Sequence, residues 1–164
     1  MVAAETNKPS LPPVDPAIIL LPNDLPAVPD LIAKISSLGG GLPSGSTDDS
    51  ARHALLNAAR SLVRALEKPR ETMIRHTWAD QCASSAISIV VETGVWAYMA
   101  KDPEPKGVAE ISTATGVEEA FLARLLRHVA AMGYIHETGR DEYRPTNFSN
   151  SLAIPIIGDG YPLL

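Results

Sequence analysis

The sequence predicts a mainly α fold that contains a winged helix-turn-helix and a small β-hairpin. Apolar residues recur at steps of three and four in several segments before residue 133, which is the spacing of helices with one buried face. Two helical segments and then two short alternating segments follow one another between residues 108 and 146, and this order is typical of a winged helix. The 164 residues are 45% hydrophobic and only 5% aromatic, so we expect aliphatic side chains to build the core.

The first third of the chain differs in composition from the rest. Eight of the 14 prolines lie before residue 50. Proline lacks a backbone N–H donor, so we expect residues 1–28 to form a flexible, proline-rich arm. The apolar run Ile18–Leu21 could dock on a partner, although a mobile tail is the simpler interpretation. A short helix is expected from Pro29 to Leu38, ended by Gly39-Gly40-Gly41 and followed by a polar loop.

Two longer helical segments follow. Asp48, Asp49 and Ser50 offer capping oxygens to a helix over residues 51–66, which Lys68-Pro69 ends. A second helical segment is expected over residues 69–93, with a break near Asp80. Its second half, Ala83–Val91, is nearly all small or apolar, which indicates a central core helix or a subunit interface.

The winged-helix unit is the most clearly marked part of the sequence. Gly94 ends the preceding helix, and one apolar turn and a charged loop precede the unit. We expect helices over residues 108–115 and 118–132, and strands over residues 134–138 and 142–146. The second helix is expected to turn inward Phe121, Leu122, Leu125, Leu126 and Val129. The tail, residues 147–164, is expected to be irregular.

Three regions are therefore expected: the arm 1–28, a helical winged-helix domain 29–152, and a truncated linker 153–164. No apolar run reaches the roughly 20 residues that a membrane span needs. The N-terminus also lacks the pattern of a secretory signal. These observations predict a soluble cytoplasmic protein without a membrane partner.

A winged helix raises the hypothesis of DNA binding. The net charge of −5 argues against it, since DNA binding needs clustered Lys and Arg. Residues 108–148 carry six acidic and four basic side chains, and Glu118 and Glu119 open the would-be recognition helix. We therefore expect no nucleic-acid partner.

The residues that could carry catalysis show no convincing pattern. The glycine run at 39–41 follows a helix rather than a strand, so it lacks the context of a cofactor loop. His53, His76, His128 and His136 have no metal-ligand spacing, and each is expected at the surface or half-buried. Cys82 is expected to be a packed thiol.

The two tryptophans are the largest apolar side chains of the sequence, and packing is the default role for both Trp78 and Trp96. Trp78 lies just before the apolar helix, where a substrate pocket or a partner chain could use it. It is the one candidate contact residue, and we predict no catalytic, cofactor-binding or metal-binding residue in this chain.

The stretch from residue 91 to residue 152 resembles a known family. It contains Ala109-Glu110-Ile111, Thr115-Gly116, Arg124–His128 and Met132-Gly133, and it ends with Thr146, Ser149 and Leu152. This pattern resembles the N-terminal dimerisation domain of plant- and fungal-type S-adenosylmethionine-dependent O-methyltransferases. The upstream helices are similar to those of the fungal branch, which acts on aromatic polyketides and related secondary metabolites.

The resemblance implies an O-methyltransferase-family protein of fungal secondary metabolism. Full-length members bind S-adenosylmethionine in a Rossmann-like domain, which has no matching position here. In family members the N-terminal module swaps helices with its partner and helps to cover the acceptor pocket. We therefore expect a homodimer, or a heterodimer with another family member, with a possible small aromatic substrate and no methylation by this chain alone, because methyl transfer needs donor and acceptor held in line.

Three other functions remain open at this stage. The chain could be an accessory or regulatory subunit that pairs with another biosynthetic enzyme. It could be a small cyclase or pericyclase-like enzyme that orients a reactive substrate in an apolar pocket. A winged-helix DNA-binding protein is the remaining alternative, and the charge balance disfavours it.

Overall fold

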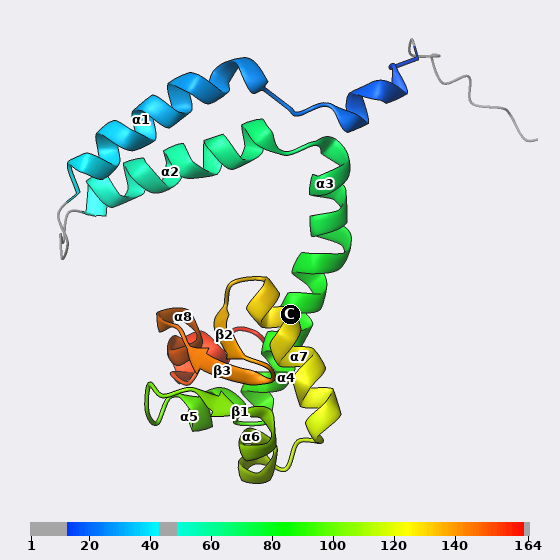
Figure 1. The fold of residues 1–164 in the computed structure, drawn as a ribbon, viewed down its shortest axis with the longest axis vertical. Coiled ribbons are helices and arrows are strands. Elements are labelled where there is room, and N and C mark those ends of the chain that lie inside the picture. The colour runs from blue at the N-terminus through cyan, green and yellow to red at the C-terminus, as the bar shows by residue number, and fades with distance from the viewer. Residues whose placement is uncertain (1–12, 43–48, 163–164) are drawn as a thin grey trace, which may run out of the picture. The chain divides into compact units, whose positions relative to one another are not determined.

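The computed structural model describes residues 13–42 and 49–162, which form a mainly helical fold with one small antiparallel sheet (Figure 1). The predicted fold class is confirmed. The chain divides into two compact units, Met1–Met73 and Ile74–Leu164, and each is described by itself. The expected single domain 29–152 stays a prediction, and the expectations for residues 1–12 and for Asp48 lie outside the described residues.

The first unit is a pair of helices preceded by two short 3₁₀ turns. The elements are η1 (Pro16–Leu20), η2 (Leu25–Ala27), α1 (Val28–Gly40) and α2 (Asp49–Leu66), and α3 (Pro69–Ile74) follows. Helices α1 and α2 pack side by side (Figure 1). The turns within the expected arm form because aspartates cap them: Asp15 accepts a hydrogen bond from the Ala17 N–H at 2.9 Å, and Asp24 accepts one from the Ala27 N–H at 3.3 Å.

The arm is anchored at the C-terminal end of α2. The last carbonyls of a helix lack partners within the helix. The backbone N–H of Asn23 donates to the Glu67 carbonyl at 3.0 Å, and that of Asp24 donates to the Ala65 carbonyl at 3.0 Å. The Asn23 side-chain amide donates to the Arg64 carbonyl at 2.9 Å. Residues 23–24 therefore cap the C-terminal end of α2 from a distant part of the sequence.

The second unit contains the winged helix. Its elements are the π-helical turn η3 (Arg75–Ala79), α4 (Asp80–Glu92), α5 (Val95–Met99), β1 (Lys106–Gly107), α6 (Val108–Thr115), α7 (Glu119–Ala131), β2 (Ile135–Gly139), β3 (Glu142–Pro145), α8 (Asn147–Ser151) and α9 (Pro155–Gly158). The strands form an antiparallel sheet in the order β1-β3-β2. The break expected near Asp80 is the π-helical turn. The hairpin is confirmed, whereas β1, α8 and α9 were not predicted.

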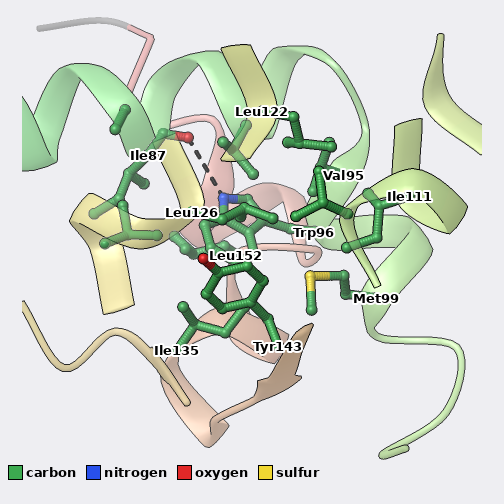
Figure 2. Close-up of a cluster of buried hydrophobic side chains, with 14 residues drawn as sticks. Ile87, Val95, Trp96, Met99, Ile111, Leu122, Leu126, Ile135, Tyr143 and Leu152 are labelled. Atoms are coloured by element: carbon green, nitrogen blue, oxygen red, sulfur yellow. Dashed lines mark hydrogen bonds between the residues drawn. The ribbon is translucent and has the colours of Figure 1, made fainter. Parts of the chain in front are cut away.

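A single hydrophobic core holds this unit together. Figure 2 shows Trp96 and Tyr143 at its centre, between side chains of α4, α6, α7 and the hairpin. Trp96 is 1% exposed and Tyr143 is 0% exposed. Of the expected inward face of α7, three residues are fully buried and two are half-buried: Leu122, Leu126 and Val129, then Phe121 and Leu125. The prediction that aliphatic side chains build the core is thus right for this unit.

Two glycines end helices where the sequence predicted an end. Gly116 follows α6 with φ of 74°, and Gly133 lies just after α7 with φ of 78°. Side chains rarely adopt this left-handed conformation, so glycine is favoured at both positions. Both turns therefore set the direction in which the chain leaves its helix within the winged helix.

Of the two roles predicted for Ala83–Val91, the structure confirms that of a core helix. The structure buries Ala83, Ala86, Ile87 and Val90 in the core of the second unit. Ser85 is exposed, and the other serines of this segment are half-buried. The apolar face of α4 is therefore used within the chain itself, and it no longer argues for a subunit interface.

Candidate functional site

The outer face of α4 lines an open hollow. Gln81, Ser84, Ser85, Ser88 and Ile89 surround it, Tyr161 forms its far wall, and its volume is about 430 Å³. The polar residues recur at steps of three and four, which places them on one face of the helix. The Ser85 hydroxyl donates to the Gln81 carbonyl at 3.0 Å. The apolar pattern of this segment does not reveal the face, because polar side chains form it.

A short row of aromatic rings leads into the hollow. The ring centroids of Tyr134 and Phe148 lie 5.1 Å apart, and those of Phe148 and Tyr161 lie 6.5 Å apart in an edge-to-face arrangement. Burial raises the pKa of the Tyr161 phenol, with a smaller contribution from Tyr134. The Tyr161 hydroxyl is therefore neutral at pH 7 and can both donate and accept a hydrogen bond.

Trp78 lies on the π-helical turn, and its side chain is 66% exposed. It therefore takes no part in the core, whereas Trp96 does. Cys82 is exposed as well, so the expectation of a packed thiol is wrong. The cause is helical geometry: Cys82 is one residue before the buried Ala83, and this places it on the outer side of α4.

The winged helix has a second hollow of about 570 Å³ beside α7. At the start of that helix the Glu118 carboxylate accepts hydrogen bonds from the N–H groups of Ala120 and Phe121, which lower its pKa. Farther along, Arg127 donates to Asp141 of the hairpin at 2.7 Å, and this contact raises the pKa of the guanidinium. Three of the charged side chains at this hollow, Glu118, Arg127 and Asp141, thus already have partners within the chain.

The first unit presents a broad apolar surface. Among its described residues only Ala58 and Ala65 are fully buried. Large apolar side chains that are about half exposed or more extend from the arm to α3: Val14, Ile18, Ile19, Leu20, Leu21, Leu25, Ile32, Val63, Leu66 and Met73. Exposed apolar side chains mark an interaction site where they form a continuous patch, so this set is a candidate contact surface, which we call the apolar surface of the first unit.

The histidines are at the surface or half-buried, as predicted. His128 is the half-buried one, and its Nε2 atom lies 3.2 Å from the Ala79 carbonyl oxygen. Within residues 13–42 and 49–162, no three His, Cys, Asp or Glu side chains are grouped so that they could hold a metal ion. No helix of this described part is long and apolar enough to cross a membrane.

Residues 13–42 and 49–162 do not form the combination of parallel strand, glycine-rich loop and helix that commonly holds a nucleotide-like cofactor. Nucleotide-like cofactors bind at the carboxyl ends of parallel strands, where a glycine-rich loop precedes a helix. The sheet of this chain is antiparallel and its strands are two to five residues long. Gly39 and Gly40 form the last residues of α1 instead of preceding a helix N-terminus.

Comparison with known proteins shows where this fold occurs. No protein-family model matches the chain. It is 27% identical over 115 residues to the O-methyltransferase lepI of Aspergillus flavus. The aligned residues cover 70% of this chain and 30% of that protein. It is 34% identical over 112 residues to the O-methyltransferase mpaG of Penicillium roqueforti, covering 66% of this chain and 27% of that protein.

Solved structures agree with these relatives. The crystal structure of OxaC matches 84% of this chain and 35% of its own, with a TM-score of 0.70 and 28% identity. A structure described as a pericyclic reaction enzyme matches 80% of this chain and 34% of its own, with a TM-score of 0.67 and 26% identity. The chain thus spans about a third of the length of its relatives, and it shares its helical, winged-helix part with these fungal O-methyltransferases.

Proposed function

We propose that this chain acts as the dimerisation domain of an O-methyltransferase-family protein of fungal secondary metabolism. The observation that carries the proposal is the apolar surface of the first unit, which two helices alone leave uncovered. The relatives that share the fold are O-methyltransferases by name. A second copy of the chain, or the matching part of another family member, would cover this surface.

One stripe of α2 is well suited to such pairing. We call Leu56, Ala59, Val63 and Leu66 the α2 stripe. Its members are spaced by three, four and three residues, which is the spacing of a helix–helix seam. The Val63 side chain is 54% exposed and that of Leu66 is 46% exposed. Burial of a fully exposed side chain of this size stabilises by about 1.5–3 kcal/mol, so each of these half-exposed side chains can contribute about half as much.

The polar hollow on α4 supports a second part of the proposal: it contributes a wall to a pocket for a small aromatic molecule. Hydroxyl groups of serines can bind phenolic or carbonyl oxygens, while Tyr161 offers a ring for stacking. Titration of the chain with a hydroxylated aromatic acid, followed by NMR, tests this part. Shifts at Ser84 and Ser88 that are lost in Tyr161→Ala support it, and the absence of any shift contradicts it.

A cyclase-type activity is the second candidate function. It is favoured by the match to a pericyclic reaction enzyme and by the hollow on α4, which could orient a reactive substrate without any cofactor. Addition of the purified chain to a reactive polyene intermediate, with product analysis, tests it. A product ratio identical to that of the uncatalysed reaction rejects it.

We further propose that this chain alone does not bind S-adenosylmethionine and that it works in the cytoplasm. Calorimetric titration of the 164-residue chain with the cofactor should show no heat of binding, and stoichiometric binding would refute this.

Light scattering at micromolar concentration tests the main proposal, for which the expected mass is twice the 17.5 kDa of one chain.

A further inference from the structure

We propose that the exposed face of α7 is a second self-association surface, on which the same helix of a second copy lies in parallel. In many winged-helix proteins the corresponding helix enters the DNA major groove. In this chain the outer face of α7 carries the small residues Ala120 and Ala123, and these lie between the acidic Glu119 and the basic Arg124. The proposed partner is another copy of this chain, and the surface is distinct from the apolar surface of the first unit.

The shape of this face permits close approach of a helix. Glu119, Ala120 and Arg124 are exposed and Ala123 is half-buried, and all four line the 570 Å³ hollow. The distance between two packed helices depends on the side chains at their contact, so Ala120 and Ala123 allow a short distance. The small side chains at the centre of this face therefore permit close approach of a second helix.

Charge complementarity identifies the occupant. Glu119 and Arg124 are five residues apart and lie on opposite flanks of the two alanines. In a parallel helix pair this separation makes Glu119 of one copy face Arg124 of the other, and the two-fold axis repeats the contact. In an antiparallel pair each flank would meet the same flank of the other copy, so like charges would face each other. The charges thus favour the parallel arrangement.

The neighbouring charges of Glu118 and Arg127 already have contacts within the chain, although the Arg124 charge also contributes to the lowered pKa of Glu118. The Glu118 carboxylate caps the start of α7, and the Arg127 guanidinium is held by Asp141. Within the described part of the chain, Glu119 and Arg124 form no ion pair, although Arg124 lies 5.7 Å from the centroid of the Phe121 ring. Both charges are therefore available to a second copy.

The contact is short, so it should be weak and dependent on salt. Exposed ion pairs contribute little free energy and are screened at high ionic strength. Pairing through the first unit would raise the effective concentration of one α7 near the other where the geometry permits both contacts. The expected signature is a salt-sensitive part of the self-association of the full chain.

Charge reversal tests the pairing in the full 164-residue chain. Sedimentation equilibrium at low salt should give an association constant at least threefold lower for E119R alone and for R124E alone than for the wild type. A 1:1 mixture of the two variants should recover it, because both flanks are basic in one variant and acidic in the other, so opposite charges face each other in both contacts. The double variant E119R/R124E should recover it as well.

The control is R144E, which makes the same charge change at an exposed residue of β3. It should leave the association constant unchanged, and far-UV circular dichroism confirms that every variant folds. Wild-type association equal to that of both single variants overturns the proposal. So does a loss in the single variants that neither the mixture nor the double variant repairs.

Discussion

The indole Nε1 of Trp96 donates a hydrogen bond to the backbone carbonyl of Ile87 at 3.4 Å. This contact connects α5 to α4 inside the core of the second unit, and Figure 2 shows it as a dashed line. Trp96 is 1% exposed, so its ring fills the space between these helices and the winged helix. The remaining core residues pack around this connection.

Truncation of Trp96 should therefore destabilise the second unit severely. We expect Trp96→Ala to lower the free energy of unfolding by about 3–5 kcal/mol, because it removes a large buried side chain and leaves a cavity. Urea denaturation followed by circular dichroism measures this. Trp78→Ala is the matched control, since that side chain is 66% exposed and should cost much less. Equal losses for the two variants would contradict the described core.

The loop before β1 depends on an ion pair. Lys106 is 5% exposed, and its ammonium donates to the Asp102 carboxylate at 2.7 Å and to the Asp102 and Glu104 carbonyls. Asp102→Asn should lower the melting temperature, because it leaves a buried ammonium without its counter-charge. Asp49→Asn, which alters an exposed pair on α2, should change the melting temperature less.

The same pair gives stability a pH dependence of known sign. The hydrogen bond from Lys106 holds the pKa of Asp102 below its ordinary value. A carboxylate with a lowered pKa in the folded state stabilises the protein above its unfolded-state pKa, and this contribution is lost as the pH falls through the lowered value. Thermal melts between pH 7 and pH 2 should show a smaller acid-induced drop for Asp102→Asn than for the wild type.

Gly158 is expected to tolerate no side chain. It is buried at the end of α9, and a Cβ atom there would overlap the Leu152 carbonyl oxygen. Gly158→Ala should cost about 1–3 kcal/mol through displacement of α9. Gly160→Ala places its Cβ 3.4 Å from the Ile157 carbonyl oxygen and serves as the milder comparison. Identical unfolding free energies for the two variants would contradict the tight contact at Gly158.

Tyr143 offers a substitution that should not harm the fold. Its hydroxyl is buried and has no hydrogen-bond partner within the described structure. Burial raises the pKa of this phenol more than the nearby Arg127 charge lowers it. Tyr143→Phe should leave the free energy of unfolding unchanged or raise it by up to about 1 kcal/mol, because an unsatisfied buried hydroxyl is costly. A loss above about 1 kcal/mol would show that the hydroxyl has a stabilising contact.

Local signals explain which parts of the fold could be predicted from the sequence. Helix ends at Gly116 and Gly133 depend on neighbouring residues alone, and these predictions are confirmed. The predicted hairpin also forms, although its turn is residues 140–141 because Gly139 is part of β2. Strand β1 has two residues and exists only because it pairs with β3, so no local pattern reveals it. Helix α8 did have a signal that we missed: Thr146 and Ser149 form a reciprocal capping box.

The candidate sites were harder to predict because they depend on exposure. Packing was the default expectation for Trp78, but its side chain is 66% exposed, and its contact with a substrate or a partner stays a prediction. The polar face of α4 follows the helical period and could have been found by marking the serines as well as the apolar residues. The apolar surface of the first unit could not be predicted from the sequence, because the exposure of its side chains depends on how α1 and α2 pack against each other.

The central claim is that the apolar surface of the first unit pairs two chains. The most direct test is the molar mass of a Val63→Glu/Leu66→Glu variant, measured by light scattering at micromolar concentration. Ala54→Glu/Asn57→Glu is the matched control, because both residues are exposed on α2 and lie outside the α2 stripe. We predict a dimer for the wild type and the control, and a folded monomer of 17.5 kDa for the α2-stripe variant. A wild-type monomer, or a dimer that survives both charges in the α2 stripe, would contradict the claim.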